Sequence, residues 1–592
     1  MTLQDAPNSV IDSLAASKTH TQSKYWRDAM TALEELYGKD DIEWLAPQIS
    51  KILAKNILSR KIELKLLDEK RSQTPLWYAQ KGRPAYCCYI DKFGQDFDGA
   101  LQHLDYLENL NVGLLHTLPL LKPREGDSDG GFAIADFFDT DPKLGNIIKF
   151  ENLANELHKR DIGLIIDIVC NHTAMENEWA QRWLKGDPEF ADFYYAFDKS
   201  EVDAYEAGLI DVFPDTAPGS FSYNEEIGKY IWTTFYPFQW DLNYKNPKVF
   251  IKMLEALLFL TNKGVDGFRL DSAPFLWKTK GTLCRNHKNT HKIIIAWRNL
   301  LKILSPSSFL LAEAIESISE VIPFFGSKDA PECDLAYNNV LMTALWAGIA
   351  DGNGQIVEKA LSKASLKPAN AKWLNYIRCH DDIIWIALKD IATNEDMQRW
   401  ADFYNNSQGF ATAMAFQAPE NMPKSSCGMA SGLCGIGKDD YGLERLKLLN
   451  AIIYVTEGVP MIYMGDEIGL GNDYSFLEND ETKAEIRWLH RPKMDWDLAA
   501  DHNKIIVFFQ QFGKLVKENI PSHNADYIKA ETIEDGKALK ITQGFGKGEI
   551  VLIANFTCEE INLPQTTNLT QLYGDKEKLS AYGVNLYRGT IA

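Results

Sequence analysis

Three carboxylates stand at or just beyond the ends of three predicted strands. They are Asp271 in "GFRLDSA", Glu313 in "LLAEAIE" and Asp381 in "RCHDDI". In a parallel barrel the carboxyl ends of all strands open at one mouth, where barrel enzymes place their reactive groups. Cleavage of a glycosidic bond needs two carboxyl groups, one to protonate the leaving oxygen and one to attack the anomeric carbon. The pattern therefore predicts glycoside chemistry, whereas one isolated acid would equally suit a structural role.

Arg269 precedes Asp271 by two positions, in a run that otherwise suits a buried strand. Strand side chains alternate between faces, so the two residues share one face. The arginine would keep the aspartate ionised and nucleophilic. Glu313, desolvated and crowded by negative charge, would have a raised pKa and act as the general acid. A structural ion pair is the alternative reading of an isolated Arg-x-Asp.

Two histidines are expected at the same mouth. His172 lies in "IVCNHTA" at a predicted strand end, and His380 is the neighbour of Asp381. We expect both to hydrogen-bond sugar hydroxyls. A metal site is the rival reading, but neither an H-x-x-x-H pair nor a compact His/Asp set is present. The sequence also lacks a phosphate-binding loop, a dinucleotide fingerprint and a serine nucleophile elbow. We therefore expect no metal and no cofactor.

Short apolar strands alternate with amphipathic helices from about residue 85 onward and must position these groups. Such alternation predicts parallel strands with crossover helices, and about eight units indicate an α/β fold of the (β/α)8 TIM barrel type. The strands that the sequence delineates are 112–120, 162–170, 264–271, 308–314, 373–381 and 459–467.

Other segments flank or interrupt the barrel. Two interruptions are too long for ordinary barrel loops, and both leave the carboxyl ends of strands, so they should cover the mouth. The predicted division is a helical N-terminal domain (1–82), a catalytic barrel (83–169, 246–382 and 445–525), an insertion after barrel strand 3 (170–245), an insertion after barrel strand 7 (383–444) and a C-terminal antiparallel β-sandwich (526–592).

Composition excludes several classes of partner. The net charge of −20 argues against nucleic acid or an anionic membrane as the main partner. No apolar run is long enough for a signal peptide core or a bilayer span. The nine cysteines are scattered without a C-x-x-C pair, which favours free thiols in a reducing compartment. We expect a cytoplasmic protein, and the choice between monomer and homodimer stays open.

Several motifs resemble those of the α-amylase family. In chain order they are "IDIVCNH", "GFRLD", "AEA" and "CHDD", followed by "GVPMIYMGDE". The stretches "LPLLKPREGDSDGGFAIADF", "WTTFYPFQWDLNYKNP" and "IRWLHRP", together with the helical N-terminal extension, are similar to the amylosucrase and sucrose hydrolase subgroup of that family. The resemblance covers nearly the whole chain and is weakest in the β domain.

The resemblance implies a role for each matching residue. Asp271 falls at the family's nucleophile, Glu313 at its general acid/base and Asp381 at its transition-state stabiliser. Asp129 and Arg487 match a salt bridge that closes the bottom of the pocket and leaves room for one glucosyl unit. The complete set of implied substrate-binding residues is Asp129, Phe132, His172, Phe235, Gln239, Arg269, His380, Asp382 and Arg487.

The implied function is retaining transfer of an α-glucosyl group from sucrose by double displacement. We expect mainly hydrolysis to glucose and fructose, with some transglucosylation, because the insertions carry Ile210, Thr412 and Ser425 where amylosucrases have acceptor-binding arginines. The expected partners are sucrose and glucan or maltooligosaccharide acceptors. The alternatives are an amylosucrase that synthesises α-1,4-glucan, a sucrose phosphorylase-like enzyme and a non-catalytic carbohydrate-binding relative.

Overall fold

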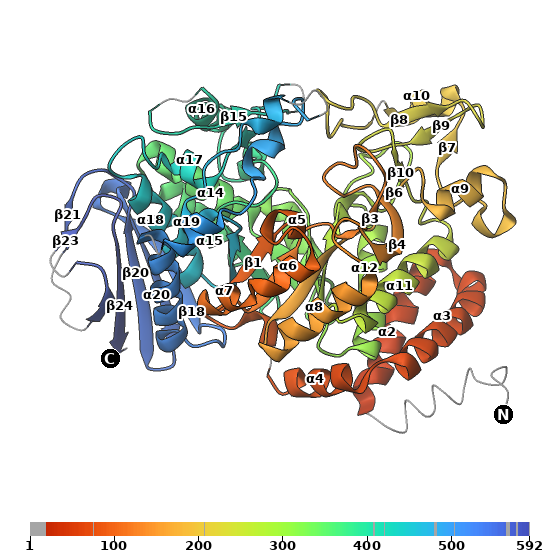
Figure 1. Cartoon of the computed structure of the whole chain (residues 1–592), viewed down its shortest axis with the longest axis horizontal. Coiled ribbons are helices and arrows are strands. Elements are labelled where there is room, and N and C mark those ends of the chain that lie inside the picture. Colours follow the sequence, from red (N-terminus) through yellow and green to blue (C-terminus); the bar gives the residue numbers. More distant parts are fainter. Residues whose placement is uncertain are drawn as a thin grey trace.

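Eight parallel strands close into a barrel at the centre of the protein (Figure 1). The computed structural model describes residues 19–590, apart from 75, 207, 407–408, 419–420, 479–481, 502–503, 564–568 and 576–577. The barrel confirms the predicted (β/α)8 fold. In order around it, the strands are β1 (Ala85–Cys88), β2 (Leu114–Thr117), β5 (Gly163–Val169), β11 (Gly267–Asp271), β12 (Phe309–Ala312), β13 (Leu335–Tyr337), β14 (Lys372–Tyr376) and β17 (Val459–Tyr463).

Two of these strands were not delineated by the sequence pattern. β1 and β13 contribute only "AYCC" and "LAY" to the ladder, and runs of three or four residues are too short to display a period. The equally short β2 and β12 were found because they lie within the longer predicted runs 112–120 and 308–314. The strand predicted over 373–381 also ends early, at Tyr376. Asp381 therefore lies on a loop five positions beyond the strand rather than at its last residue.

Amphipathic helices surround the barrel and connect its strands. Each is apolar on the side that faces the sheet, as in α12, where Ile293, Ile294, Trp297 and Leu301 are buried. The main barrel helices are α8 (Ile147–Lys159), α11 (Pro247–Asn262), α12 (Lys288–Leu304), α14 (Asn339–Asp351), α15 (Gln355–Ala364), α18 (Gly442–Val455) and α20 (Lys504–Asn519).

Three helices precede the barrel and pack against its outer helices. They are α2 (Thr19–Tyr37), α3 (Lys39–Ser59) and α4 (Ile62–Ser72), drawn in red at the lower right of Figure 1. Leu33 of α2 and Leu45 of α3 belong to the same buried core as the barrel. Arg60 forms a buried ion pair of 2.7 Å with Asp68 and also donates to the backbone oxygen of Thr261 on α11. The helical extension is thus held by both apolar and polar contacts.

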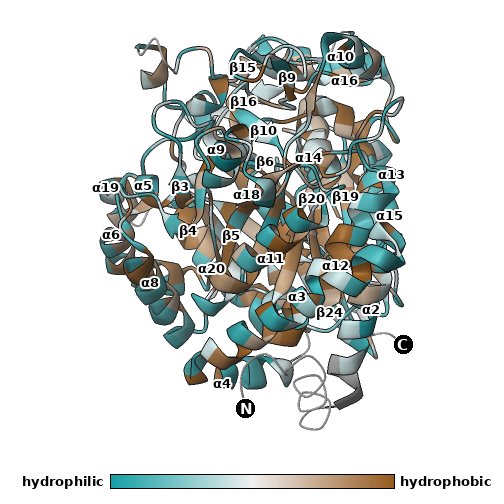
Figure 2. Cartoon of the chain, turned by 90° about the vertical axis from the view of Figure 1, so that its right-hand side faces the viewer, coloured by the Kyte–Doolittle hydropathy of each residue, from teal (hydrophilic) through white to brown (hydrophobic). Residues whose placement is uncertain are grey.

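Both long insertions lie on one side of the barrel, opposite α4 (Figures 1 and 2). The first contains α9 (Glu178–Leu184), α10 (Lys199–Glu206) and a small antiparallel sheet. The second contains α16 (Asn394–Asn405) and the short pair β15 (Met414–Ala415) and β16 (Ser426–Cys427). They cover the carboxyl ends of the strands, because that is where the chain leaves β5 and β14.

An antiparallel sheet forms the C-terminal part of the chain. Its strands run in the order β18 (Tyr527–Ile533), β19 (Ala538–Phe545), β20 (Gly548–Asn555), β24 (Val584–Thr590) and β22 (Leu569–Tyr573).

The second layer of the expected sandwich is small. Among the described residues it consists of a two-stranded ribbon, β21 (Ile561–Asn562) paired with β23 (Lys578–Leu579). Leu552 faces the barrel core instead, while Val551 faces the ribbon. The second layer is small because barrel helices cover the other face of the sheet.

All nine cysteines are free, and eight of them are buried. Among the described residues, no helix combines the length and the apolar character that a membrane crossing requires.

Candidate active site

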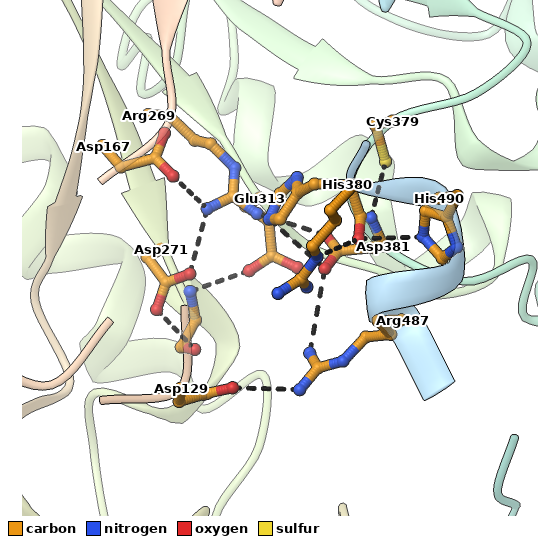
Figure 3. Close-up of polar contacts among 12 residues, drawn as sticks. Asp129, Asp167, Arg269, Asp271, Glu313, Cys379, His380, Asp381, Arg487 and His490 are labelled. Carbon is orange, nitrogen blue, oxygen red and sulfur yellow. Dashed lines mark hydrogen bonds and ion pairs between the residues drawn. The ribbon is translucent and has the colours of Figure 1, made fainter. Parts of the chain in front are cut away.

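Arg269 stands at the centre of the charged cluster at the barrel mouth (Figure 3). It lies on β11 between Phe268 and Leu270, whose side chains are fully buried on the opposite face. Its Nη1 contacts Asp271 Oδ1 at 3.0 Å and Asp167 Oδ2 at 3.1 Å. Two-residue alternation along the strand therefore places the arginine and the aspartate on one face, as predicted.

Ser272 links the two carboxyl groups that the sequence singled out. Its hydroxyl donates to Asp271 Oδ2 at 2.9 Å, and its backbone N–H donates to Glu313 Oε2 at 2.7 Å. The residue has a φ of 53°, a left-handed conformation that is uncommon outside glycine. That turn directs the amide toward Glu313 at the end of β12, so both acids have a shared donor between them.

Burial gives the two acids different protonation states. Desolvation raises the pKa of Asp271 to about 6, against the lowering effect of Arg269. Desolvation also raises the pKa of Glu313 to about 8, and the negative charge of Asp271 adds to it. At neutral pH Asp271 is mostly ionised while Glu313 is mostly protonated. An anionic nucleophile beside a neutral acid is the arrangement that retaining glycoside cleavage requires.

Asp381 faces this pair from the loop after β14. Its Oδ2 lies 3.5 Å from Arg269 Nη2, and its Oδ1 lies 4.0 Å from Arg487 Nη1. His380 Nε2 approaches Asp381 Oδ1 at 3.3 Å without hydrogen-bond geometry. Asp381 thus lies between two guanidinium groups, and the three predicted carboxylates share one cluster.

The predicted histidines are buried and neutral. Desolvation lowers the pKa of His172 to about 4, and desolvation followed by the charge of Arg269 lowers the pKa of His380 far below its usual value. His172 Nε2 and both ring nitrogens of His380 have no hydrogen-bond partner among the described residues. Buried polar atoms without partners are rare, and these can accept or donate to hydroxyl groups of a bound molecule.

Aromatic rings form the walls around these polar groups. Phe132 stacks on His380 with ring centroids 5.5 Å apart and an interplanar angle of 12°. Phe235 contacts the ring of His172 at 5.2 Å and that of Phe275 at 5.5 Å. Flat apolar faces beside hydrogen-bonding groups suit the two sides of a sugar ring.

Asp129 and Arg487 meet, as the resemblance implied. Arg487 Nη2 lies 2.9 Å from Asp129 Oδ1, and both side chains are at least nine-tenths buried. Gln239 donates to the second oxygen of Asp129 at 3.3 Å. Asp382 is close enough for the positive charge of Arg487 to lower its pKa, although burial is the larger effect and raises it. The twelve predicted residues therefore lie together at the barrel mouth.

Sequence reasoning missed Glu485, which holds Arg487 in place. Arg487 donates through Nε to Glu485 Oε1 at 2.6 Å and through Nη2 to Glu485 Oε2 at 2.8 Å. Tyr236 donates its hydroxyl to the same carboxylate at 3.0 Å. The presence of Glu485 two positions before Arg487 was a visible signal, but its pairing depends on a loop without a regular period.

A buried network under Arg269 was also missed. Asp167 accepts from Arg269 and lies 2.6 Å from His116 Nε2, and Tyr337 lies 3.3 Å from the other ring nitrogen of that histidine. Asp167 was detectable as a charged residue within the apolar strand "GLIIDIV".

Lys278 forms a second unexpected network behind His172. Its fully buried ammonium lies 2.7 Å from Asp241 Oδ2 and donates to Asn171 Oδ1 at 3.2 Å and to the Phe275 backbone oxygen at 2.6 Å. Asn171 in turn donates to Asp241 at 2.9 Å. This lysine fixes the residue that directly precedes His172.

One group of adjacent side chains has metal-ligating character. Ligand atoms of Cys379, His380 and Asp381 all lie within 4.8 Å of one another. Two of the three are buried. Desolvation raises the pKa of the Cys379 thiol to about 12.

The chain folds as a (β/α)8 barrel with paired carboxylates at its mouth, an arrangement that suits retaining glycoside cleavage. The model of the α-amylase catalytic domain matches residues 71–422. The chain therefore belongs to the α-amylase family, which confirms the resemblance.

Curated relatives carry several substrate names. The chain is 29% identical over 419 residues to trehalose synthase/amylase TreS of Mycolicibacterium smegmatis, covering 70% of this chain and 66% of that protein. It is 27% identical over 396 residues to glucosylglycerate phosphorylase of Allomeiothermus silvanus, covering 66% and 69% of the two chains. The chain thus spans just under two thirds of the length of the mycobacterial relative.

Solved structures share the fold. Sucrose 6F-phosphate phosphorylase from Thermoanaerobacter thermosaccharolyticum superposes with a TM-score of 0.67 and 18% identity, over 81% of this chain and 94% of that one. Trehalose-6-phosphate hydrolase of Bacillus licheniformis gives a TM-score of 0.65 at 18% identity, over 87% and 100%.

Proposed function

We propose that this protein is a retaining α-glucosyl-transferring enzyme that acts on sucrose, mainly hydrolysing it to glucose and fructose. The observation that carries the proposal is the ion pair between Asp129 and Arg487. With Glu485 as a second anionic partner of the arginine, it forms a fixed polar wall at the site. A wall there leaves space for a single glucosyl unit, which suits a disaccharide donor and disfavours an internal segment of starch.

The chemistry proceeds in two displacements. Asp271 forms a bond to the anomeric carbon while the bond to the fructosyl oxygen breaks, and Glu313 gives its proton to that oxygen. Asp381 stabilises the positive charge that develops on the sugar ring. In the second step Glu313, now a carboxylate, takes a proton from water as the water oxygen attacks the same carbon and the bond from that carbon to Asp271 breaks. Two inversions give net retention and regenerate both acids.

The contacts of the second insertion support hydrolysis over polymer synthesis. A growing glucan needs acceptor subsites that concentrate and orient a hydroxyl, since water competes at about 55 M. Residues 383–444 contain four basic side chains. Lys389 pairs with Glu320, Arg399 with Asp351 and Lys424 with Asp215, so three of the four already have acidic partners. Few basic side chains are thus left to bind an acceptor glucan, which favours hydrolysis. An amylosucrase that builds α-1,4-glucan is the alternative, and we expect some transglucosylation in either case.

Isomerisation of a glucosyl disaccharide is the second candidate. The names of the curated relatives, trehalose synthase among them, favour a donor such as trehalose that also presents one terminal glucosyl unit. A phosphorylase-like reaction is a third possibility, because glucosylglycerate phosphorylases are also among the relatives.

A product analysis separates these proposals. The protein is incubated with sucrose, with trehalose, and with sucrose plus inorganic phosphate, and the products are resolved by chromatography. Equal release of glucose and fructose from sucrose supports hydrolysis, and glucose 1-phosphate would identify a phosphorylase. Insoluble glucan would identify an amylosucrase, and interconversion of trehalose would identify an isomerase. A non-catalytic relative would release no fructose, and Asp271→Asn is the blank for that comparison.

Cytoplasmic location remains part of the proposal. The nine free cysteines, eight of them buried, support a reducing compartment.

A further inference from the structure

A pocket of about 280 Å³ lies on the face of the barrel opposite the catalytic mouth. Its lining comes from the segments that precede three neighbouring strands: Arg83 before β1, Gly113 before β2 and Asp161 before β5. Helix α4 contributes Lys70 and Arg71, and helix α20 contributes Lys517. In Figure 1, α4 lies at the bottom of the molecule, away from both insertions. The pocket therefore shares no residue with the candidate active site.

The lining of this pocket is strongly cationic. It holds the five basic side chains Lys70, Arg71, Lys81, Arg83 and Lys517, with Asp161 as its one acidic side chain. The chain as a whole has a net charge of −20. A concave site lined by five basic side chains and one acidic side chain stands apart on such an acidic protein. Converging cations that lack enough acidic partners create a favourable potential for an anion.

The single negative charge of Asp161 does not neutralise the cations around it. Arg83 Nη1 contacts Asp161 Oδ2 at 2.6 Å, and Lys70 Nζ contacts its other oxygen at 3.2 Å. The Lys70 pair is more than half exposed on both sides, so it contributes little and is weakened by salt. Lys517 forms no ion pair with any residue that the structure describes. At least one cation is thus free, and another is held only weakly.

Arg71 supplies a buried guanidinium with spare donors. Its residue is 4% exposed, its Nη1 is paired with Asp266, and its guanidinium lies 3.6 Å from the ring centroid of Trp77. Its Nε and Nη2 have no hydrogen-bond partner among the described residues. Buried donors without acceptors are rare in folded proteins. Guanidinium groups recognise phosphate oxygens through such paired N–H donors.

Lys81 is a further group that would respond to an anion. Its ammonium donates to the backbone oxygens of Val455 and Thr456 at 3.2 Å and 2.7 Å. Burial, followed by the positive charge of Lys372, lowers the pKa of Lys81 to about 7. A negative charge in the pocket would favour the protonated form.

We propose that this pocket binds a phosphate group, either free inorganic phosphate or the phosphate of a small monoester. A dianion matches several converging cations better than a single carboxylate does. The volume is near the lower limit of small-molecule sites, about 300 Å³, so a ligand of the size of a sugar phosphate is the largest that fits. Because α4 and α20 both contribute, the ligand ties the N-terminal helices to the last barrel helix and stabilises the fold by mass action.

The test is ligand-dependent thermal stability of the full chain. Wild-type protein is titrated with inorganic phosphate and with glucose 6-phosphate, each against chloride at matched ionic strength. We expect a saturable rise in Tm with at least one of them. Tighter binding of inorganic phosphate would identify the free anion as ligand, and tighter binding of glucose 6-phosphate would identify a monoester.

Charge reversal localises the binding. Lys517→Glu should weaken it by about tenfold or more, because a charge-assisted contact becomes a repulsion. Lys514→Glu is the matched control: it lies one turn earlier on the same helix, is 70% exposed in its side chain, and is not part of the pocket. It should change the affinity by less than about twofold. Sucrose turnover should be unaltered in both variants. No saturable stabilisation by either ligand, or wild-type affinity in Lys517→Glu, overturns the proposal.

Discussion

Arg487 and Asp129 are 358 positions apart in the chain, yet Arg487 Nη2 lies 2.9 Å from Asp129 Oδ1. Burial raises the pKa of Asp129 to about 7 even beside this arginine, and Glu485, whose pKa the arginine lowers to about 2, is the more firmly ionised partner. The arginine is thus shared between a stable anion and a titratable one. The pair is the part of the site on which donor selectivity is proposed to depend.

Removing this pair should open the pocket. Arg487→Ala leaves two buried carboxylates without their cation, a cost of roughly 3–5 kcal/mol for a buried pair. We expect a strong loss of kcat/KM for sucrose and a gain of activity on maltooligosaccharides, measured by steady-state kinetics. Asp129→Ala should also lower kcat/KM for sucrose. The loss of transition-state stabilisation in the double variant should be smaller than the sum of the losses in the two single variants. Unchanged sucrose kinetics in both single variants would contradict the assignment.

Asp271→Asn should retain the fold, because the amide is nearly isosteric, and should lose several orders of magnitude in turnover. Glu313→Gln should lose comparable activity on sucrose but much less on α-glucosyl fluoride, whose leaving group needs no proton. Thermal unfolding of both variants controls for misfolding. Sucrose turnover near the wild-type rate by Asp271→Asn would refute its role as nucleophile.

The pH dependence of kcat/KM should be bell-shaped. Activity needs Asp271 ionised and Glu313 protonated, so it should rise through about pH 6 and fall through about pH 8. These limbs belong to the coupled pair rather than to either residue alone. Glu313→Gln with the fluoride donor should lose the basic limb. A profile that stays flat between pH 5 and 9 would show that these acids do not control the rate.

Lys278→Met should destabilise the protein and disturb His172. The substitution leaves Asp241 buried without its cation, for which the expected cost is about 3–5 kcal/mol. Adding Asp241→Asn should restore part of the free energy of unfolding, since the uncompensated charge is then gone. Chemical denaturation measures both effects. Equal stability of the single and double variants would mean that the ion pair does not contribute as proposed.

Arginine on the insertions should increase transfer relative to hydrolysis. Ile210 is 51% exposed and precedes Phe213, whose ring contacts Phe235, so Ile210→Arg can reach an acceptor. Thr412→Arg is the equivalent change on the second insertion. Ser425 is a poor third position, because it is buried and bonded to the Gln417 backbone oxygen, so Ser425→Arg should destabilise the protein instead. Chromatography of oligosaccharides at high sucrose gives the ratio of transfer to hydrolysis. An unchanged ratio in both Ile210→Arg and Thr412→Arg would contradict this reading.

The sequence by itself determined the barrel and the charged centre of its site. Strand side chains alternate with a period of two, so the shared face of Arg269 and Asp271 follows from their spacing alone. The carboxyl ends of parallel strands converge in every such barrel, which brings Glu313 to the same mouth. These are consequences of local geometry and fold class. The strands β1 and β13 escaped detection because three or four residues carry no measurable period, whereas the equally short β2 and β12 lie within longer predicted runs.

Only the tertiary structure decided which side chains join that centre from irregular segments. Glu485 beside Arg487, and Lys278 among the oxygens of Asn171 and Asp241, depend on loops whose paths no periodic pattern encodes. The cationic pocket is a further case. Lys70 and Lys517 are 447 positions apart in the chain, and they converge only because α4 and α20 both pack on the barrel. Long-range packing, rather than local propensity, sets these distances.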